Sequence, residues 1–137
     1  MLRRVSHLGL AVKDLDAAVR LYEGVFGLEP ERRWVAEADQ MEAAAFRVGD
    51  LEIELMQPLS DDSPVGRFIA RRGEGIHHVA YKVDDVAEAL AKARASGVET
   101  IDEEPREGGG GRTRIGFLHP RGTMGVLTEL EEDVPGH

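Results

Sequence analysis

The chain has 137 residues, the size of one compact domain, and its lack of cysteine excludes disulfide scaffolds, zinc ribbons, thiol nucleophiles and iron–sulfur clusters. Its 26 acidic residues outnumber its 17 Lys and Arg residues, and the net charge of −9 argues against nucleic acid and anionic membranes as partners. Because no long apolar run is present, we expect no signal peptide, no membrane span and a cytoplasmic protein.

The first half of the chain predicts a strand, a helix and three further strands. Side-chain character alternates over 5–12, as in a half-buried strand. Asp14 is the expected N-cap of a helix whose apolar residues recur at helical spacing until Gly27. Three strands are expected next, at 32–38, 42–48 and 51–57. Gly49 and Asp50 predict a hairpin turn between the last two.

A short linker helix is expected over 63–72. Ser63 precedes Pro64, which suits the first position of a helix, and Gly73 is a typical stop signal. This helix separates the two halves of the chain.

The second half repeats the order of the first. A strand around His78 leads to a helix that is capped at Asp85 and stopped by Gly97. Three strands are expected next, at 98–103, 112–118 and 124–130. A turn is expected at 120–122, and the acidic stretch 131–137 indicates a frayed C-terminal end.

The match between the halves is close enough to predict an internal duplication. Two residue pairs are 71 positions apart and one is 75 positions apart: His7 with His78, Asp14 with Asp85, and Glu54 with Glu129. We therefore predict an α+β fold of two tandem βαβββ modules, at about 5–57 and 76–130, in a single domain over 1–137. The modules are expected to form a curved eight-stranded mixed sheet around a metal site.

One histidine and one glutamate from each module are the candidate metal ligands: His7, Glu54, His78 and Glu129. Because side chains alternate along a strand, Glu54 points away from the apolar face formed by Leu51, Ile53 and Leu55. Two neutral imidazoles and two carboxylates would balance a divalent ion. Nitrogen and oxygen donors without thiolate suit Co, Mn, Ni, Fe or Zn.

Other readings of the polar residues stay open. A lone histidine on a strand is more often a hydrogen-bonded core residue than a ligand, and it is the matched placement that favours ligation here. His77 has the opposite parity to His78, which indicates packing or hydrogen bonding. His119, just before Pro120, indicates turn chemistry, and Glu52 indicates a solvated or strand-paired charge.

Seven stretches of the sequence carry a resemblance to a known family: HLGLAV at 7–12, IELMQPL at 53–59, DSPV at 62–65, GEGIHHVAY at 73–81, DEEPR at 102–106, FLHP at 117–120 and GVLTEL at 125–130. Together they resemble the vicinal oxygen chelate superfamily and, within it, the methylmalonyl-CoA epimerase family. The resemblance spans nearly all of residues 5–131.

The resemblance implies a metal-dependent epimerase. Such an enzyme interconverts the C2 stereoisomers of methylmalonyl-CoA by 1,1-proton transfer through a metal-stabilised enolate. It implies the four ligands named above, with the thioester carbonyl and the free carboxylate of the substrate in the two open positions. Position 54 is glutamine in some family members. Glu129 is the implied first proton-transfer group and doubles as a ligand.

Inversion needs a proton-transfer group on each face of a planar intermediate. The glutamate that supplies the second group in some family members aligns with Ala43 or Ala44 of this chain. The neighbouring Glu42 is the predicted second group, with a solvated charge at a strand edge as the alternative reading. Glu37 is a weaker option.

The residues that would hold the CoA phosphates are less visible. The glycine run 108–111 lacks the lysine and the strand-to-helix context of a phosphate loop and predicts a flexible loop. Four nearby arginines are either local phosphate contacts or surface charges: Arg106, Arg112, Arg114 and Arg121.

Two further functions remain as alternatives. One is a glyoxalase-type isomerase, a lyase or a dioxygenase of the same superfamily, and the other is a protein that binds a small molecule without catalysis. The expected partner is a small acyl-CoA substrate. Exposed strand edges in each module need cover, so we also expect a homodimer.

Overall fold

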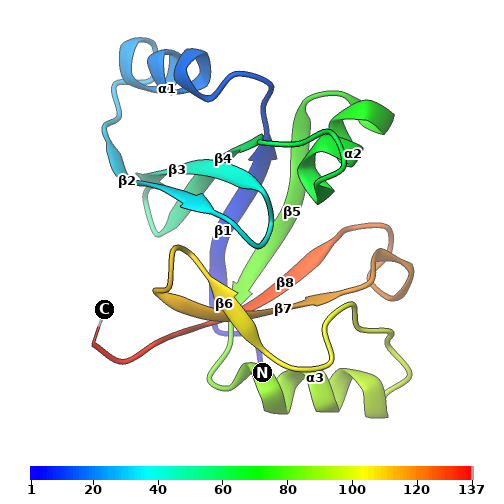
Figure 1. The fold of residues 1–137 in the computed structure, drawn as a ribbon. Coiled ribbons are helices and arrows are strands. Elements are labelled where there is room, and N and C mark those ends of the chain that lie inside the picture. The colour runs from blue at the N-terminus through cyan, green and yellow to red at the C-terminus, as the bar shows by residue number, and fades with distance from the viewer. Residues whose placement is uncertain (137) are drawn as a thin grey trace. The chain divides into compact units, whose positions relative to one another are not determined.

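The computed structural model describes residues 1–136. The chain folds into two compact units. The N-terminal unit comprises His7–His77, and the C-terminal unit comprises Met1–Ser6 together with the chain from His78 onward. Each unit holds four strands and one helix of the duplicated pattern, and the linker helix belongs to the N-terminal unit (Figure 1).

The N-terminal unit contains six elements: β1 (Arg4–Ala11), α1 (Leu15–Gly24), β2 (Pro30–Ala36), β3 (Met41–Val48), β4 (Leu51–Pro58) and α2 (Pro64–Arg72). Its strands pair in the order β2-β3-β4-β1, with β1 parallel to β4 and the other neighbours antiparallel. The strand β1 begins in the C-terminal unit, since that unit includes residues up to Ser6.

The C-terminal unit repeats this arrangement with β5 (Gly75–Lys82), α3 (Val86–Ala95), β6 (Arg106–Gly108), β7 (Thr113–Leu118), a short 3-10 helix (Pro120–Gly122) and β8 (Thr128–Asp133). Its strands pair in the order β5-β8-β7-β6, with β5 parallel to β8. The full hydrogen-bonding order is β2-β3-β4-β1-β5-β8-β7-β6, so the predicted eight-stranded mixed sheet of two βαβββ modules is confirmed.

The two long helices begin with the same capping device. The predicted N-caps are confirmed, because the Asp14 side chain accepts from the backbone N–H of Ala17 and the Asp85 side chain accepts from that of Glu88. A side chain on the last strand of each unit takes a further helix N–H. Gln57 accepts from Leu15 in the N-terminal unit, and Glu132 accepts from Val86 in the C-terminal unit.

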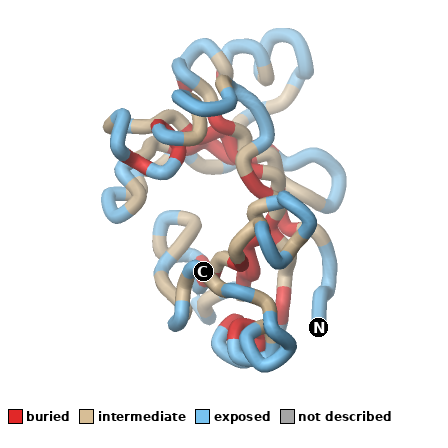
Figure 2. The backbone as a smooth tube through the Cα atoms, turned by 90° about the vertical axis from the view of Figure 1, so that its right-hand side faces the viewer, coloured by how far each residue is buried: buried red, intermediate tan, exposed pale blue. Residues whose placement is uncertain are grey.

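Each helix covers one face of the strands of its own unit. Leu15 and Val19 of α1 pack on Ala44, Phe46 and Leu55. The matching core of the C-terminal unit forms beneath α3 from Val83, Val86, Ala89, Leu90, Leu118 and Leu130. Most buried residues lie on the strands, and Figure 2 shows how buried, intermediate and exposed stretches are distributed along the backbone.

The linker helix is confirmed as α2. Its N-cap is Ser63, whose side chain accepts from the N–H of Gly66, and Gly73 ends it with a positive φ of 77°. Val65 packs with Ala11, Ala43 and Met56, which lie on the face of the N-terminal strands opposite α1. The helix therefore closes part of that face with an apolar cluster.

Two strands of the second module were predicted in the wrong place. No strand of the described chain covers 98–103, where the pairing is reduced to a single bridge between Thr100 and Leu118. The physical reason is Asp102, whose carboxylate accepts the backbone N–H of Phe117 at 2.8 Å in place of a ladder carbonyl. The outer strand is instead β6, three residues that follow Pro105.

The last strand begins four residues later than predicted. Met124 and Gly125 both have positive φ, at 60° and 86°, so the chain turns there and cannot extend. The predicted frayed end is wrong for 131–133, because β8 continues to Asp133 and Glu131 is buried. The predicted stretch also includes residue 137, which lies outside the described residues.

No helix among residues 1–136 combines the length and the apolar character that crossing a membrane requires.

Candidate functional site

In the N-terminal unit, His7 and Glu54 form a buried pair. His7 lies on β1 and Glu54 on the parallel β4, and His7 Nε2 is 3.6 Å from Glu54 Oε2. The side chains are 4% and 8% exposed. Since Ile53 and Leu55 pack toward α1, alternation along β4 turns Glu54 to the opposite face. We call this the site face of the N-terminal unit.

In the C-terminal unit, His78 and Glu129 form the equivalent pair. They lie on the parallel strands β5 and β8, and His78 Nε2 is 3.1 Å from Glu129 Oε1. Their side chains are 3% and 6% exposed, and Leu130 next in sequence faces α3. The ring of Phe117, opposite Glu129 on β7, meets the His78 ring edge-on at 5.4 Å. The face that carries these residues is the site face of the C-terminal unit.

These residues have the chemistry of metal ligands. His7, His78 and Glu129 are buried, and each offers one ligand atom that could hold a metal ion. Glu54 adds a carboxylate beside His7. Burying a carboxylate is costly unless a cation or hydrogen bonds compensate it, and an imidazole Nε2 donor beside a carboxylate oxygen suits a divalent transition metal.

Glu42 lies on the other face of the N-terminal sheet. It is directly opposite Gln57 across β3 and β4, and Gln57 faces α1, so Glu42 does not share the site face with Glu54. Its carboxylate contacts Arg33 Nε at 2.9 Å. The hydrogen bond to Glu42, joined by one to Asp16 on α1, raises the pKa of the Arg33 guanidinium above its usual value.

Ala43 is the residue of this segment that does lie on the site face. It is opposite Met56 on β4 and Trp34 on β2, and it is fully buried. Ala44 faces α1, and Glu37 is exposed in the turn after β2. Of the four positions considered for the second proton-transfer group, only Ala43 therefore lies on the site face, and its side chain carries no acid.

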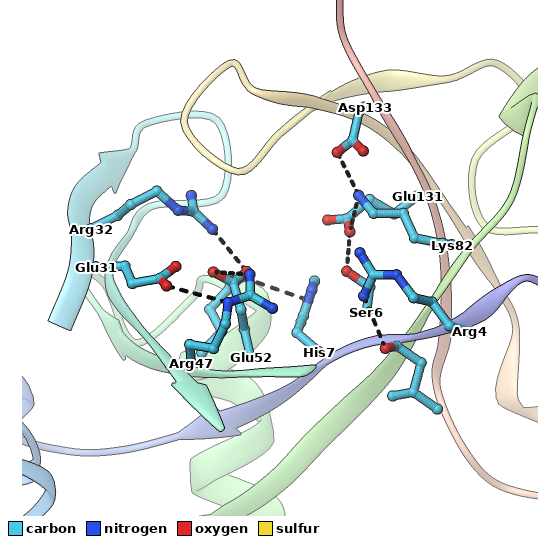
Figure 3. Close-up of polar contacts among 12 residues, drawn as sticks. Arg4, Ser6, His7, Glu31, Arg32, Arg47, Glu52, Lys82, Glu131 and Asp133 are labelled. Carbon is cyan, nitrogen blue, oxygen red and sulfur yellow. Dashed lines mark hydrogen bonds and ion pairs between the residues drawn. The ribbon is translucent and has the colours of Figure 1, made fainter. Parts of the chain in front are cut away.

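The remaining polar residues have structural partners. His77 meets the ring of Phe68 edge-on at 5.0 Å, and His119 Nδ1 accepts the backbone N–H of Arg121 in a turn. Glu52 is a strand-paired charge, which was one of the two interpretations of the sequence. It contacts Arg32 at 3.1 Å and Arg47 at 3.5 Å (Figure 3).

Of the four arginines considered for the CoA phosphates, two form ion pairs with carboxylates and two are exposed. Arg106 Nε is 3.1 Å from Asp102, and the Arg106 guanidinium lies over the ring of Phe117 at 5.6 Å. Arg121 pairs with Glu99 at 3.0 Å. Arg112 and Arg114 are exposed, and the glycine run forms the turn between β6 and β7.

One polar cluster was missed by sequence reasoning. Lys82 Nζ lies 2.9 Å from Glu131 and 2.7 Å from Asp133, and the hydroxyl of Ser6 donates to Glu131 (Figure 3). Parity could have found it, because Lys82 is four residues after His78 and Glu131 two residues after Glu129. Interpreting 131–137 as a frayed end hid this signal.

Comparisons with known proteins agree on one superfamily. Residues 6–117 match the model of the Glyoxalase/Bleomycin resistance protein/Dioxygenase superfamily. The chain is 37% identical over 131 residues to an uncharacterised protein, YqjC, of Bacillus subtilis, covering 96% of this chain and 93% of that one. It is 31% identical to an ethylmalonyl-CoA/methylmalonyl-CoA epimerase of Cereibacter sphaeroides, covering 96% of this chain and 99% of that one.

The comparison with solved structures also finds similarity to an epimerase. The chain superposes on a methylmalonyl-CoA epimerase in complex with methylmalonyl-CoA and NH4+ with a TM-score of 0.94 and 38% identity. The match covers 98% of this chain and 97% of that one.

Proposed function

Because the chain belongs to the glyoxalase/bleomycin resistance protein/dioxygenase superfamily, we propose that it is a divalent-metal-dependent epimerase acting at C2 of methylmalonyl-CoA or a close acyl-CoA. Similarity to epimerases over nearly the whole chain supports the reaction. The observation that carries the proposal is the buried His–Glu pair that recurs at the same place in each unit.

In this proposal, His7, Glu54, His78 and Glu129 hold one divalent ion, drawn from Co, Mn, Ni, Fe or Zn. When bound, the ion would stabilise the negative charge that develops on the substrate oxygens as the C2 proton leaves. The protein's own contribution is to present two imidazole nitrogens and two carboxylate oxygens in fixed orientations. Their strands are held by ladder hydrogen bonds, and their backs are packed by α1 and α3.

Glu129 is proposed to transfer the C2 proton on one face of the substrate. Its carboxylate is buried beside His78, and the Phe117 ring packs against that histidine. Glu42 remains the predicted second group. Its ion pair with Arg33 would have to open, and its side chain would have to leave the α1 face, before it could transfer a proton.

The deciding experiment is hydrogen exchange at C2. Stereopure methylmalonyl-CoA is incubated in deuterated water with chelator-treated protein, with and without added Co²⁺. We expect Co²⁺-dependent deuterium incorporation by mass spectrometry together with loss of stereochemical purity. Exchange no faster than in a protein-free sample containing Co²⁺ would overturn the proposal.

The homodimer and the cytoplasmic location stay predictions. Light scattering at micromolar concentration tests the first, and a monomeric mass would contradict it.

A further inference from the structure

The site face of the C-terminal unit continues past His78 and Glu129 as a row of polar side chains. Lys82 on β5 is directly opposite Glu131 on β8, and Asp133 at the end of β8 is directly opposite Thr113 on β7. Opposite residues in neighbouring strands share a face, and alternate residues along a strand do too. Lys82, Glu131, Asp133 and Thr113 therefore lie on the same face as Glu129, and we call them the polar row.

The polar row leads from the buried pair to solvent. Along β8, the side chains of Glu129 and Glu131 are 6% and 7% exposed, whereas that of Asp133 is 75% exposed. Glu129 and Asp133 are four residue steps apart along the strand, about 13 Å at the usual rise. A ligand whose reactive end lies at Glu129 and whose tail reaches solvent could follow this path.

Thr113 carries an unused hydroxyl in the row. It is 8% exposed, and within residues 1–136 its Oγ1 is the one buried side-chain oxygen or nitrogen without a hydrogen-bond partner. Leaving such a group unpaired costs free energy, so an unpaired buried hydroxyl in a native fold calls for an explanation. A bound ligand that accepts its O–H would supply one.

The fold itself does not require the polar row. In the N-terminal unit, the places of Lys82 and Glu131 are taken by Ala11 and Met56, which face each other in the same register between parallel strands. There α2 covers them with Val65 in an apolar cluster. At these two positions, charged residues therefore occur only in the unit whose face is not covered by α2.

We propose that the polar row binds the pantetheine arm of the acyl-CoA, with the amide farther from the thioester at Thr113 and Asp133. This inference rests on the proposed function and names a recognition element for it. The Thr113 hydroxyl donates to the amide carbonyl, and the Asp133 carboxylate accepts the amide N–H. Lys82, Glu131 and Asp133 together carry one net negative charge, which disfavours a phosphate and is compatible with a neutral amide.

Three methylmalonyl thioesters test the assignment: those of CoA, of pantetheine, which lacks the nucleotide, and of N-acetylcysteamine, which lacks the far amide. The variant is Thr113→Val, which keeps the shape and removes the hydroxyl. We expect KM to rise about fivefold for the CoA and pantetheine thioesters, the value of one net hydrogen bond. The N-acetylcysteamine thioester should be unaffected.

The matched control is Thr128→Val. Thr128 is also a buried threonine in this unit, but its hydroxyl already donates to the carbonyl of Val126 at 2.9 Å, and it lies opposite Leu118 of the α3 core. The Thr128→Val variant should not change the ratio of KM values among the three thioesters. An equal rise for all three thioesters with Thr113→Val, no rise, or a rise confined to the CoA thioester would overturn the inference.

Failure of the proposed function gives a different result, since the wild-type protein would then turn over none of the thioesters. Calorimetric titration with propionyl-pantetheine, which needs no turnover, still decides the question. Weaker binding by Thr113→Val than by the wild type supports the subsite, and equal binding overturns it.

Discussion

The two units are built from the same pattern, yet their site faces differ. Both have an Asp-capped helix over one face, a second cap from the last strand, and one buried His–Glu pair. Beyond that pair, the N-terminal unit presents Ala11 and Met56 beneath α2, and the C-terminal unit presents Lys82 and Glu131. What the units share builds the fold and the candidate ligands, and what only one unit has is the better candidate for substrate recognition.

The largest expected effect separates the two glutamates that occupy equivalent places. Glu129→Gln keeps the size of the side chain and one oxygen donor but cannot accept a proton. We expect kcat to fall on the order of a thousandfold, as for loss of a general base. Glu54→Gln should lose much less, because its proposed role is ligation alone. Steady-state kinetics with Co²⁺ supplied in excess measures both.

Metal content provides the control for this pair of variants. Both should bind Co²⁺ in calorimetry and keep the circular dichroism of the wild type. Equal losses of kcat in the two variants would show that the units contribute symmetrically and that Glu129 has no separate proton-transfer role.

Much of this duplicated arrangement can be predicted from the sequence. The caps Asp14 and Asp85 and the helical periodicity after them predict α1 and α3, because capping and amphipathicity are local properties. The matched spacing of His7 and His78 likewise indicates two copies of one module. These features need no knowledge of distant contacts.

The errors arise where a long-range contact decides the local structure. The apolar residues near 98–103 favour a strand, but the Asp102 carboxylate occupies the N–H of Phe117 and ends the pairing. The face on which Glu42 lies is also set by the register of β3 against β4, which a single strand does not reveal, and its proton-transfer role stays a prediction. The fate of Glu131 depends on Ser6 and Lys82, more than a hundred and about fifty residues earlier in the chain.

The second prediction exchanges the residue pairs that differ between the units, Ala11–Met56 and Lys82–Glu131. Met56→Glu places a carboxylate under α2 with no cation opposite, where Met56 is 1% exposed. We expect a loss of about 3 kcal/mol in the free energy of unfolding, because an unpaired buried charge must be desolvated or protonated. Lys82→Ala should also lower the free energy of unfolding, because it removes the cation that lies 2.9 Å from the buried Glu131 carboxylate.

The double variant Lys82→Ala with Glu131→Met gives the C-terminal unit the Ala–Met pair of its counterpart. Replacing a buried ion pair by apolar residues is often neutral, so we expect stability within about 1 kcal/mol of the wild type in urea denaturation. A large loss in the double variant would show that the ion pair is retained for stability, and the contrast between the units would then need no functional explanation.

The smallest effect concerns how each helix fits its strands. Gly116 on β7 and Ala44 on β3 hold the same place, opposite Leu130 and Leu55. A Cβ on Gly116 would lie 2.7 Å from Leu90 Cδ1, so Gly116→Ala should cost about 1–2 kcal/mol through overpacking. The helix residue at the matching place in the N-terminal unit is the smaller Val19, which leaves room for an alanine.

A double-variant cycle tests this compensation of volumes. Leu90→Val alone removes buried methylene volume from a fully buried position and should destabilise. Combined with Gly116→Ala, it recreates the Val–Ala pair of the N-terminal unit, and the two losses should partly cancel, with a coupling of about 1 kcal/mol in urea unfolding. Strict additivity would mean that Leu90 moves aside without strain, and that glycine at 116 is set by something other than the packing of α3.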